Sequence, residues 1–252
     1  MLIDCHCHLS LPEFSPDLSK ILEELKVNFF RVIESTINPE NTKKALKLFK
    51  DTPLVNFALG FHPYYCDTFN KQILKEYARI IELNNNIIAI GEVGLDIKSK
   101  AGLDKQKEVF SEFIDLAKQF NLPVIVHNRG FKETALSIIK EKRIKKVIFH
   151  CFSQDKDFLN QIIKNGFLVS FAGNLTFKNA YSLRDAAKNC PNSNILSETD
   201  SPYLAPQIIR GKRNTPQYVK EVIKEIAAIK ENDSQLIQKI TLDNAKNIFN
   251  LT

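Results

Sequence analysis

The chain has 252 residues, 44% of them hydrophobic and 25% charged, which excludes a disordered, collagen-like or coiled-coil protein. Its formal net charge of +6 permits an anionic partner without requiring one. Five scattered cysteines are not a disulfide framework, no apolar run reaches the roughly 18 residues of a membrane span, and no signal peptide follows Met1, so we expect one cytoplasmic domain over residues 1–252.

Short apolar runs rich in β-formers alternate with amphipathic helical stretches along the whole chain. The predicted strands are Leu2–Cys7, Phe29–Ile33, Leu54–Leu59, Ile87–Gly91, Pro123–His127, Lys146–His150, Phe167–Phe171 and Asn194–Glu198. Eight strands alternating with helices over about 250 residues are typical of an α/β protein with a TIM (β/α)8 barrel. An open doubly wound sheet stays as the alternative, because counting strands does not show closure.

Helix starts and ends are also readable. The pairs Ser15-Pro16, Asn38-Pro39 and Thr215-Pro216 each place an N-cap residue before a proline at the first helical position. Two helices follow the eighth strand, at Pro216–Lys230 and Ser234–Phe249. One completes the eighth unit, and the other is expected to pack as an extra C-terminal helix.

His6 and His8 alternate on the first predicted strand, so their side chains point to the same side of the sheet. Two imidazoles in this arrangement can converge on one metal ion. Taken alone, the pair is explained equally well by two buried histidines that bond to the backbone.

Four more candidates stand at the ends of other predicted strands: Glu92 after the fourth, His127 and His150 ending the fifth and sixth, and Asp200 after the eighth. In a closed barrel all of these positions lie at the C-terminal rim, where the active sites of barrel enzymes are found. With His6 and His8 they supply four imidazoles and two carboxylates, too many for one tetrahedral catalytic ion with an open position. The set favours two ions that share a carboxylate and a water.

Seven segments resemble the successive signatures of the TatD family, metal-dependent hydrolases of TIM-barrel fold that include deoxyribonucleases. They are Asp4–Leu9, Gly60–Tyr64, Ala89–Asp96, Leu122–His127, His150–Ser153, Glu198–Leu204 and Arg210–Asn214. The chain departs from the family pattern at Ser153-Gln154, Ile97 and Thr215, which leaves loop shape and substrate preference open.

The resemblance implies two groups of metal ligands. One ion would be held by His6, His8, Glu92 and Asp200, and the other by Glu92, His127 and His150, with Glu92 bridging them. Imidazole ligands favour Zn, Mn, Fe, Co or Ni, and the resemblance keeps Mg among the candidates.

Three residues are expected to take part in catalysis. Asp200 is our candidate for the general base that accepts the proton of the attacking water, in addition to being a ligand. Glu92 acts by bridging the two ions. His62, in a Gly-Phe-His-Pro turn after the third strand, either contacts a phosphate or protonates the leaving oxygen, and a purely structural turn histidine is an equal alternative.

Substrate contacts are expected from the rim loops. Arg129 stands two residues after His127, and Arg210, Lys212 and Arg213 lie in the long loop after the eighth strand, so all four are candidates for phosphate binding. Rim aromatics can stack on unpaired bases, although packing roles are expected for most of them: Phe61, Tyr64, Tyr65 and Tyr203.

Neighbours of the candidates on the same strands have supporting roles. Asp4 and Glu198 are each two residues before a candidate ligand and are expected to hold the rim by hydrogen bonding. Alternation places Cys5, Cys7 and Cys151 on the opposite side from the histidines, as small buried groups.

The sequence therefore predicts a two-metal deoxyribonuclease that uses a metal-bridging hydroxide, with single-stranded DNA trimmed from an end as its expected reaction. Two alternatives remain open. One is hydrolysis of a carboxylic ester or amide, such as the ester of a D-aminoacyl-tRNA, and the other is a non-catalytic nucleic-acid-binding barrel. No membrane partner is expected, and a monomer is compatible with the sequence.

Overall fold

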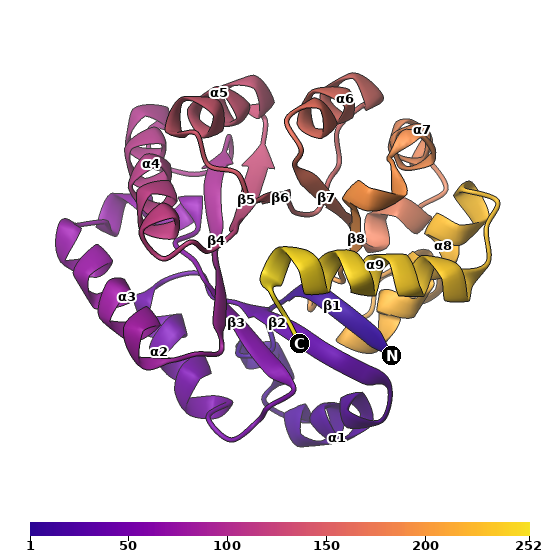
Figure 1. The fold of residues 1–252 in the computed structure, drawn as a ribbon. Coiled ribbons are helices and arrows are strands. Elements are labelled where there is room, and N and C mark those ends of the chain that lie inside the picture. The colour runs from indigo at the N-terminus through magenta and orange to yellow at the C-terminus, as the bar shows by residue number, and fades with distance from the viewer.

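The computed structural model describes residues 1–252 and contains a ring of eight parallel strands, each followed by at least one helix on the outside (Figure 1). The strands are hydrogen-bonded in sequence order, from β1 to β8. They are β1 (Leu2–Cys7), β2 (Phe29–Ser35), β3 (Val55–Leu59), β4 (Ile87–Asp96), β5 (Val124–Arg129), β6 (Val147–Phe149), β7 (Leu168–Phe171) and β8 (Ile195–Ser197). The helices are α1 (Leu18–Asn28), α2 (Pro39–Leu48), α3 (Lys71–Leu83), α4 (Leu103–Gln119), α5 (Lys132–Lys142), α6 (Lys156–Lys164), α7 (Tyr181–Asn189), α8 (Val219–Ile229) and α9 (Ser234–Phe249).

The barrel closes between β1 and β8 through few backbone contacts. Cys7 and Ser201 form a single parallel bridge there. The amide of His8 donates to the carbonyl of Ser201 at 2.8 Å, and the amide of Asp200 donates to the carbonyl of His6 at 2.9 Å. The TIM barrel is thus confirmed and the open sheet excluded, and the closing contacts involve residues of the candidate site.

All eight predicted strands are present, and β4 shows the largest difference from expectation. It continues to Asp96, so Glu92 lies within the strand and not after it. Gly91 and Gly94 allow this, with φ angles of 151° and 149°. A Cβ at Gly94 would lie 2.0 Å from the carbonyl oxygen of His127, so only glycine lets β4 pass this close to β5.

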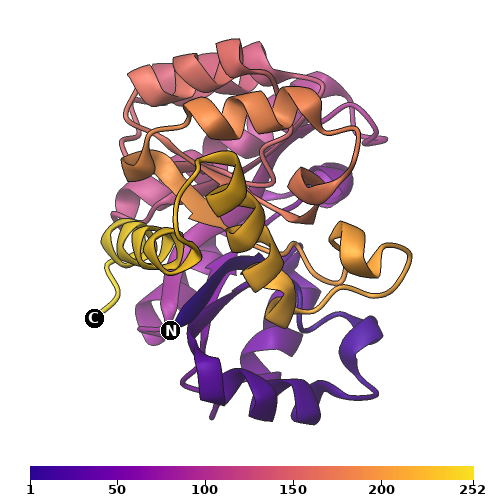
Figure 2. The same ribbon diagram turned by 90° about the vertical axis from the view of Figure 1, so that its right-hand side faces the viewer.

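The barrel interior has its own apolar core, separate from the larger core between strands and helices. It contains Ile3, Cys5, Ile33, Ala58, Ile88, Ala89, Ile125, Ile148 and Leu196. Ala245 and Phe249 of α9 pack against it, so the predicted C-terminal helix covers one end of the barrel (Figures 1 and 2). In Figure 2, α9 and both termini lie at one end of the barrel, and the orange loop after β8 projects from the other.

The position of Cys5 corrects the simple alternation expected for β1. A register shift between Asp4 and Cys7 interrupts the pairing with β2. As a result Cys5 belongs to the interior core while Cys7 packs in the outer one, as predicted. Strict alternation fails here because a bulge inserts an extra residue.

Of the three predicted helix starts, only Asn38-Pro39 has the expected cap: the Asn38 side chain accepts from the amide of Asn41 at the start of α2. Ser15-Pro16 is wrong, because α1 starts at Leu18 with Asp17 at its N-cap position. Pro216 opens a 3₁₀ turn that leads into α8, and Thr215 makes no capping bond. None of the helices is both long and apolar enough to cross a membrane.

Candidate metal centre

The six candidate ligands meet at one place, beside a cavity of about 540 Å³ at the C-terminal ends of the strands. Its lining residues include Tyr203 and Leu204 of the loop after β8, which projects from the end of the barrel opposite α9 (Figure 2). His8, Glu92, His127, His150 and Asp200 line it, while His6 is fully buried beneath. The strands bring together residues that are almost 200 positions apart in the sequence.

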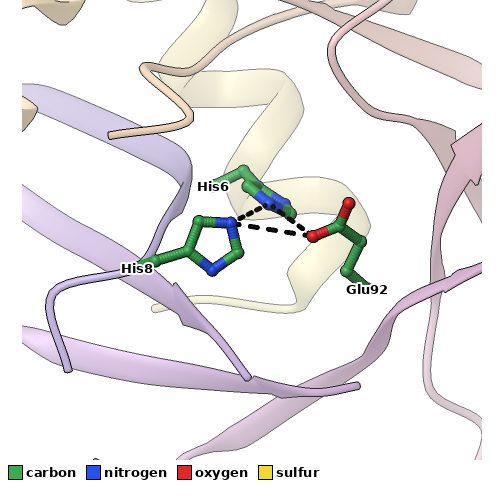
Figure 3. A group of neighbouring side chains, drawn as sticks. All are labelled: His6, His8 and Glu92. Atoms are coloured by element: carbon green, nitrogen blue, oxygen red, sulfur yellow. Dashed lines mark hydrogen bonds and ion pairs between the residues drawn. The ribbon is translucent and has the colours of Figure 1, made fainter. Parts of the chain in front are cut away.

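The first group of donors consists of His6, His8, Glu92 and Asp200. The two Nε2 atoms of the histidines are 3.1 Å apart (Figure 3). Each lies 3.5–3.6 Å from Oε2 of Glu92 and 3.3–3.6 Å from Oδ1 of Asp200. A tetrahedron with zinc–nitrogen bonds of 2.0–2.1 Å has edges of about 3.3–3.4 Å, so these spacings suit a metal ion.

The second group consists of Glu92, His127 and His150. Oε1 of Glu92 lies 2.5 Å from Nδ1 of His127 and 2.9 Å from Nε2 of His150. The two ring nitrogens are 3.3 Å apart. These are distances of direct hydrogen bonds, so the donors have to move apart slightly to hold an ion.

Glu92 belongs to both groups and presents a different oxygen to each. Burial alone would raise the pKa of Glu92, but His150 and His127 beside it outweigh burial and hold the pKa well below its usual range. The carboxylate is therefore ionised. Burial lowers the pKa of His8, yet its bond to Asp200 and the charge of Glu92 prevail and raise that pKa to about 9, so an arriving cation displaces a proton there.

The ring nitrogens that face away from the site are also bonded. Nδ1 of His8 donates to the carbonyl of Ser35 at 2.7 Å, and Nδ1 of His6 lies 3.0 Å from the Ser35 hydroxyl. Nε2 of His127 donates to Asp96 at 2.9 Å, and Nδ1 of His150 lies 3.3 Å from Glu198. Such partners fix the ring orientation and leave the other nitrogen free to ligate, the usual arrangement around protein-bound metals.

His62 differs from these four imidazoles. Its Nδ1 accepts from the backbone amide of Tyr64 at 3.2 Å, which places the proton of the neutral ring on Nε2. That Nε2 lies 3.6 Å from Oε1 of Glu92. Burial lowers the pKa of His62 to about 3, so the ring is neutral and offers an N–H to the site. In this tautomer His62 is a hydrogen-bond donor toward the site. One of its ring nitrogens also lies within 4.8 Å of ligand atoms of Glu92 and His127, so these three residues form a further candidate metal-binding group.

Three buried carboxylates outside the two groups hold the backbone beside the candidate ligands. Glu34 accepts from the amides of Leu9 and Ser10, directly after His8. Asp4 accepts from the amide and hydroxyl of Thr199, directly before Asp200. Glu198 accepts from the amide of Cys151, directly after His150. The expected supporting roles of Asp4 and Glu198 agree with these bonds.

Sequence reasoning missed Ser35 and Asp96 as partners of histidines. Asp96 shares a strand with Glu92 at a spacing of four, a signal that could have found it; Ser35 has no distinguishing signal. The expectation for Cys151 is wrong: it lines the cavity, because its backbone turns into the left-handed region at φ 46° and strand alternation ends before it.

The predicted phosphate contacts fall into two sets. Arg129 lines the cavity, half exposed, with its guanidinium 3.7 Å from Asp96. Arg210, Lys212 and Arg213 do not line it. Arg210 stacks on Phe177 at 4.2 Å.

Arg213 is occupied by an ion pair. Its two terminal nitrogens contact the two oxygens of Asp17 at 2.9 and 2.5 Å, and one of them also donates to the carbonyl of Glu13. Asp17 stands at the N-cap of α1 without capping it, because Arg213 takes its carboxylate. The next residue, Asn214, donates to the carbonyls of Thr199 and Tyr203. Arg213 thus anchors the loop after β8 to the start of α1.

We expect Arg213→Ala and Asp17→Ala each to lower the free energy of unfolding by up to about 1 kcal/mol, the range for a partly exposed pair. The loss of unfolding free energy in the double variant should be smaller than the sum of the two single losses, because both changes remove the same contact. Denaturant unfolding of all four proteins measures this coupling, with Lys212→Ala as the neighbouring control. Fully additive losses would contradict the anchoring role.

A TIM barrel whose catalytic rim gathers four imidazoles around two carboxylates has the layout of a metal-dependent hydrolase. Comparison with known proteins agrees. The family model described as TatD related DNase matches residues 3–250. The chain is 36% identical to the uncharacterized metal-dependent hydrolase YabD of Bacillus subtilis, with all of both chains covered. It is 33% identical to the uncharacterized metal-dependent hydrolase MJ1582 of Methanocaldococcus jannaschii, covering 98% of this chain and 96% of that relative.

Solved structures show the same likeness. The crystal structure of YJJV, a TatD homolog from Escherichia coli K12, superposes with a TM-score of 0.91 at 26% identity, covering 100% of this chain and 98% of that one. A TatD family hydrolase from Entamoeba histolytica shares the fold with a TM-score of 0.87 at 20% identity, with the same coverage. The chain belongs to the TatD family of metal-dependent hydrolases.

Proposed function

We propose that the chain is a two-metal deoxyribonuclease that removes nucleotides from an end of single-stranded DNA. The observation that carries the proposal is the position of Glu92, which presents Oε2 to His6 and His8 and Oε1 to His127 and His150. One ionised carboxylate between two groups of imidazoles suits a pair of divalent cations.

In this proposal His6, His8, Glu92 and Asp200 hold the first ion, and Glu92, His127 and His150 hold the second. The imidazole-rich donors favour Zn, Mn, Fe, Co or Ni, with Mg as a further candidate. Bound divalent ions would lower the pKa of water and polarise a phosphoryl oxygen. All donors come from one chain, so the proposal needs no partner subunit.

The chain's own residues then handle protons and orientation. Asp200 accepts the proton of the attacking water. Its carboxylate lies next to both His6 and His8, and its amide is fixed on the His6 carbonyl. His62 stays neutral and donates a hydrogen bond from its Nε2–H to a phosphoryl or leaving oxygen, without giving up the proton. Arg129, at the cavity wall, pairs with a neighbouring phosphate of the strand.

Several features support DNA as the substrate. The matching family model is described as a DNase, the net charge is +6, and Arg129 faces the cavity. We further propose that the enzyme works in the cytoplasm, where reduced thiols are the rule, since all five cysteines are unpaired.

The test is a substrate panel on metal-stripped protein reloaded with Zn, Mn, Co, Ni, Fe or Mg in turn. We expect at least one loaded form to cleave single-stranded DNA with a kcat/KM at least about tenfold above that for duplex DNA, because a duplex must unpair before it enters the cavity. Stripped protein is the matched control. Faster turnover of D-aminoacyl-tRNA would favour the ester hydrolase, and binding of DNA without any turnover would favour the non-catalytic barrel.

A further inference from the structure

The two halves of the barrel rim give the cavity walls of different chemical character. Loops after β8, β1, β2 and β3 contribute an apolar wall, made of Tyr203, Leu204, Leu11, Ile37, Tyr64 and Tyr65. Strands and loops from β4 to β7 contribute a polar wall, made of Asp96, Asn128, Arg129, Ser153 and Asn174. The strands are adjacent in sequence order, so each wall is continuous and the two stand on opposite sides of the metal centre.

Two tyrosines leave much of their rings uncovered on the apolar wall. Tyr64 is 50% exposed and Tyr203 is 51% exposed, although most large apolar side chains of the protein are buried. Phe61, in the same turn as Tyr64, is only 1% exposed and packs on Phe113, so it belongs to the core. Aromatic surface kept open beside a site is typical of a binding surface.

Both rings are held against histidines of the site. Tyr64 meets the ring of His62 edge-on, with centroids 4.6 Å apart. Tyr203 meets the ring of His8 edge-on at 6.1 Å. A flat group resting on either tyrosine therefore lies next to the place where the scissile bond must be.

We propose that this apolar wall is a nucleobase subsite, in which Tyr203 and Tyr64 stack on unpaired bases beside the scissile phosphate. The proposal rests on the proposed function. It adds that the apolar wall binds the bases of the substrate and the polar wall binds its phosphates. A nucleotide has a flat, apolar-faced base and an anionic backbone, so it matches a cavity with tyrosines on one side and Arg129 on the other. The cavity volume of about 540 Å³ is in the range for a small ligand, which suits nucleotide-sized groups.

The experiment uses the metal-loaded protein and short single strands in which an abasic residue replaces each nucleotide in turn. Binding is measured by fluorescence anisotropy on strands with hydrolysis-resistant phosphorothioate linkages, and kcat/KM on ordinary strands. The variants are Tyr64→Ala and Tyr203→Ala, with Tyr64→Phe and Tyr203→Phe as conservative partners. Tyr181→Ala, which removes an exposed tyrosine of α7 outside the cavity, is the control.

We expect the wild type to bind about 5- to 150-fold more weakly when the abasic residue occupies a subsite position, the usual worth of one stacked base. Each alanine variant should lose the same factor in affinity for the intact strand. It should lose no further affinity on the strand in which the base that stacks on the replaced tyrosine is missing. The phenylalanine variants keep the ring and should keep the affinity, and Tyr181→Ala should match the wild type.

The proposal is overturned if no abasic position weakens binding. It is also overturned if each alanine variant loses as much affinity on every abasic strand as on the intact one, with no strand on which the loss disappears. Its failure is separable from that of the proposed function. Cleavage of DNA without dependence on any base would leave the deoxyribonuclease standing and remove the base subsite. Base-dependent binding without cleavage under any metal would leave the base subsite standing and remove the deoxyribonuclease.

Discussion

Replacing Glu92 by alanine should abolish turnover and lower the metal content at both positions. The reason is geometric, because Oε2 faces His6 and His8 while Oε1 faces His127 and His150, so one side chain serves two groups. We expect a loss in kcat of about 10³-fold or more, beyond the 10- to 100-fold typical of residues that only orient a ligand. Elemental analysis and kinetics on the same sample measure both effects.

Glu92→Gln sharpens this prediction. The amide has nearly the shape of the carboxylate but no charge, so it neutralises neither cation. We therefore expect the Glu92→Gln variant to lose turnover and metal as well. Glu231→Ala, which removes an exposed carboxylate in the turn after α8, controls for the change in net charge and should keep both metals. A Glu92→Ala protein that retains two metals per chain would show that the bridging assignment is wrong.

The barrel could be predicted because its signals are local. Each strand is an apolar run, and the rim position of His127 or His150 follows from where that run ends. The predicted C-terminal helix over Ser234–Phe249 agrees with α9 for the same reason, since its period and its Asp233 cap are both in the sequence. Once the sheet closes into a barrel, the six candidate ligands stand at one rim.

What the sequence could not show depends on contacts between distant segments or on irregular backbone. The bulge in β1 turns Cys5 inward, and no neighbouring residue in the sequence indicates that a bulge forms there. Arg213 looked like a phosphate contact because it is basic and near the rim, yet Asp17, almost 200 residues earlier, takes its guanidinium. The different role of His62 depends on one backbone amide, that of Tyr64, which fixes the proton on the ring nitrogen facing the site.

The second large effect is expected from Asp200→Asn, which separates the two roles proposed for this residue. As a ligand Asp200 compensates charge, and as a base it must accept a proton. Asparagine keeps an oxygen near Nε2 of His8, where Oδ1 now lies at 3.3 Å, but it cannot act as a carboxylate base. We therefore expect the variant to retain much of its metal and to lose about 10²- to 10⁴-fold in kcat, the usual worth of general base catalysis.

The pH dependence gives an independent reading of the same variant. His6 and His8 hold the pKa of Asp200 below its usual range against the effect of burial, so the wild-type carboxylate is ionised at neutral pH and ready to accept a proton. A lowered pKa means that this capacity is lost only as the pH falls through that value, and the acidic limb of the pH–rate profile should change when the group is removed. Metal occupancy has to be measured at each pH, because protonation of His8 also expels the cation and produces an acidic limb of its own. A metal-replete Asp200→Asn enzyme with near-normal kcat would assign the proton to another acceptor, and among the residues facing the cavity Asp96, bonded to His127, would then be the next carboxylate to test.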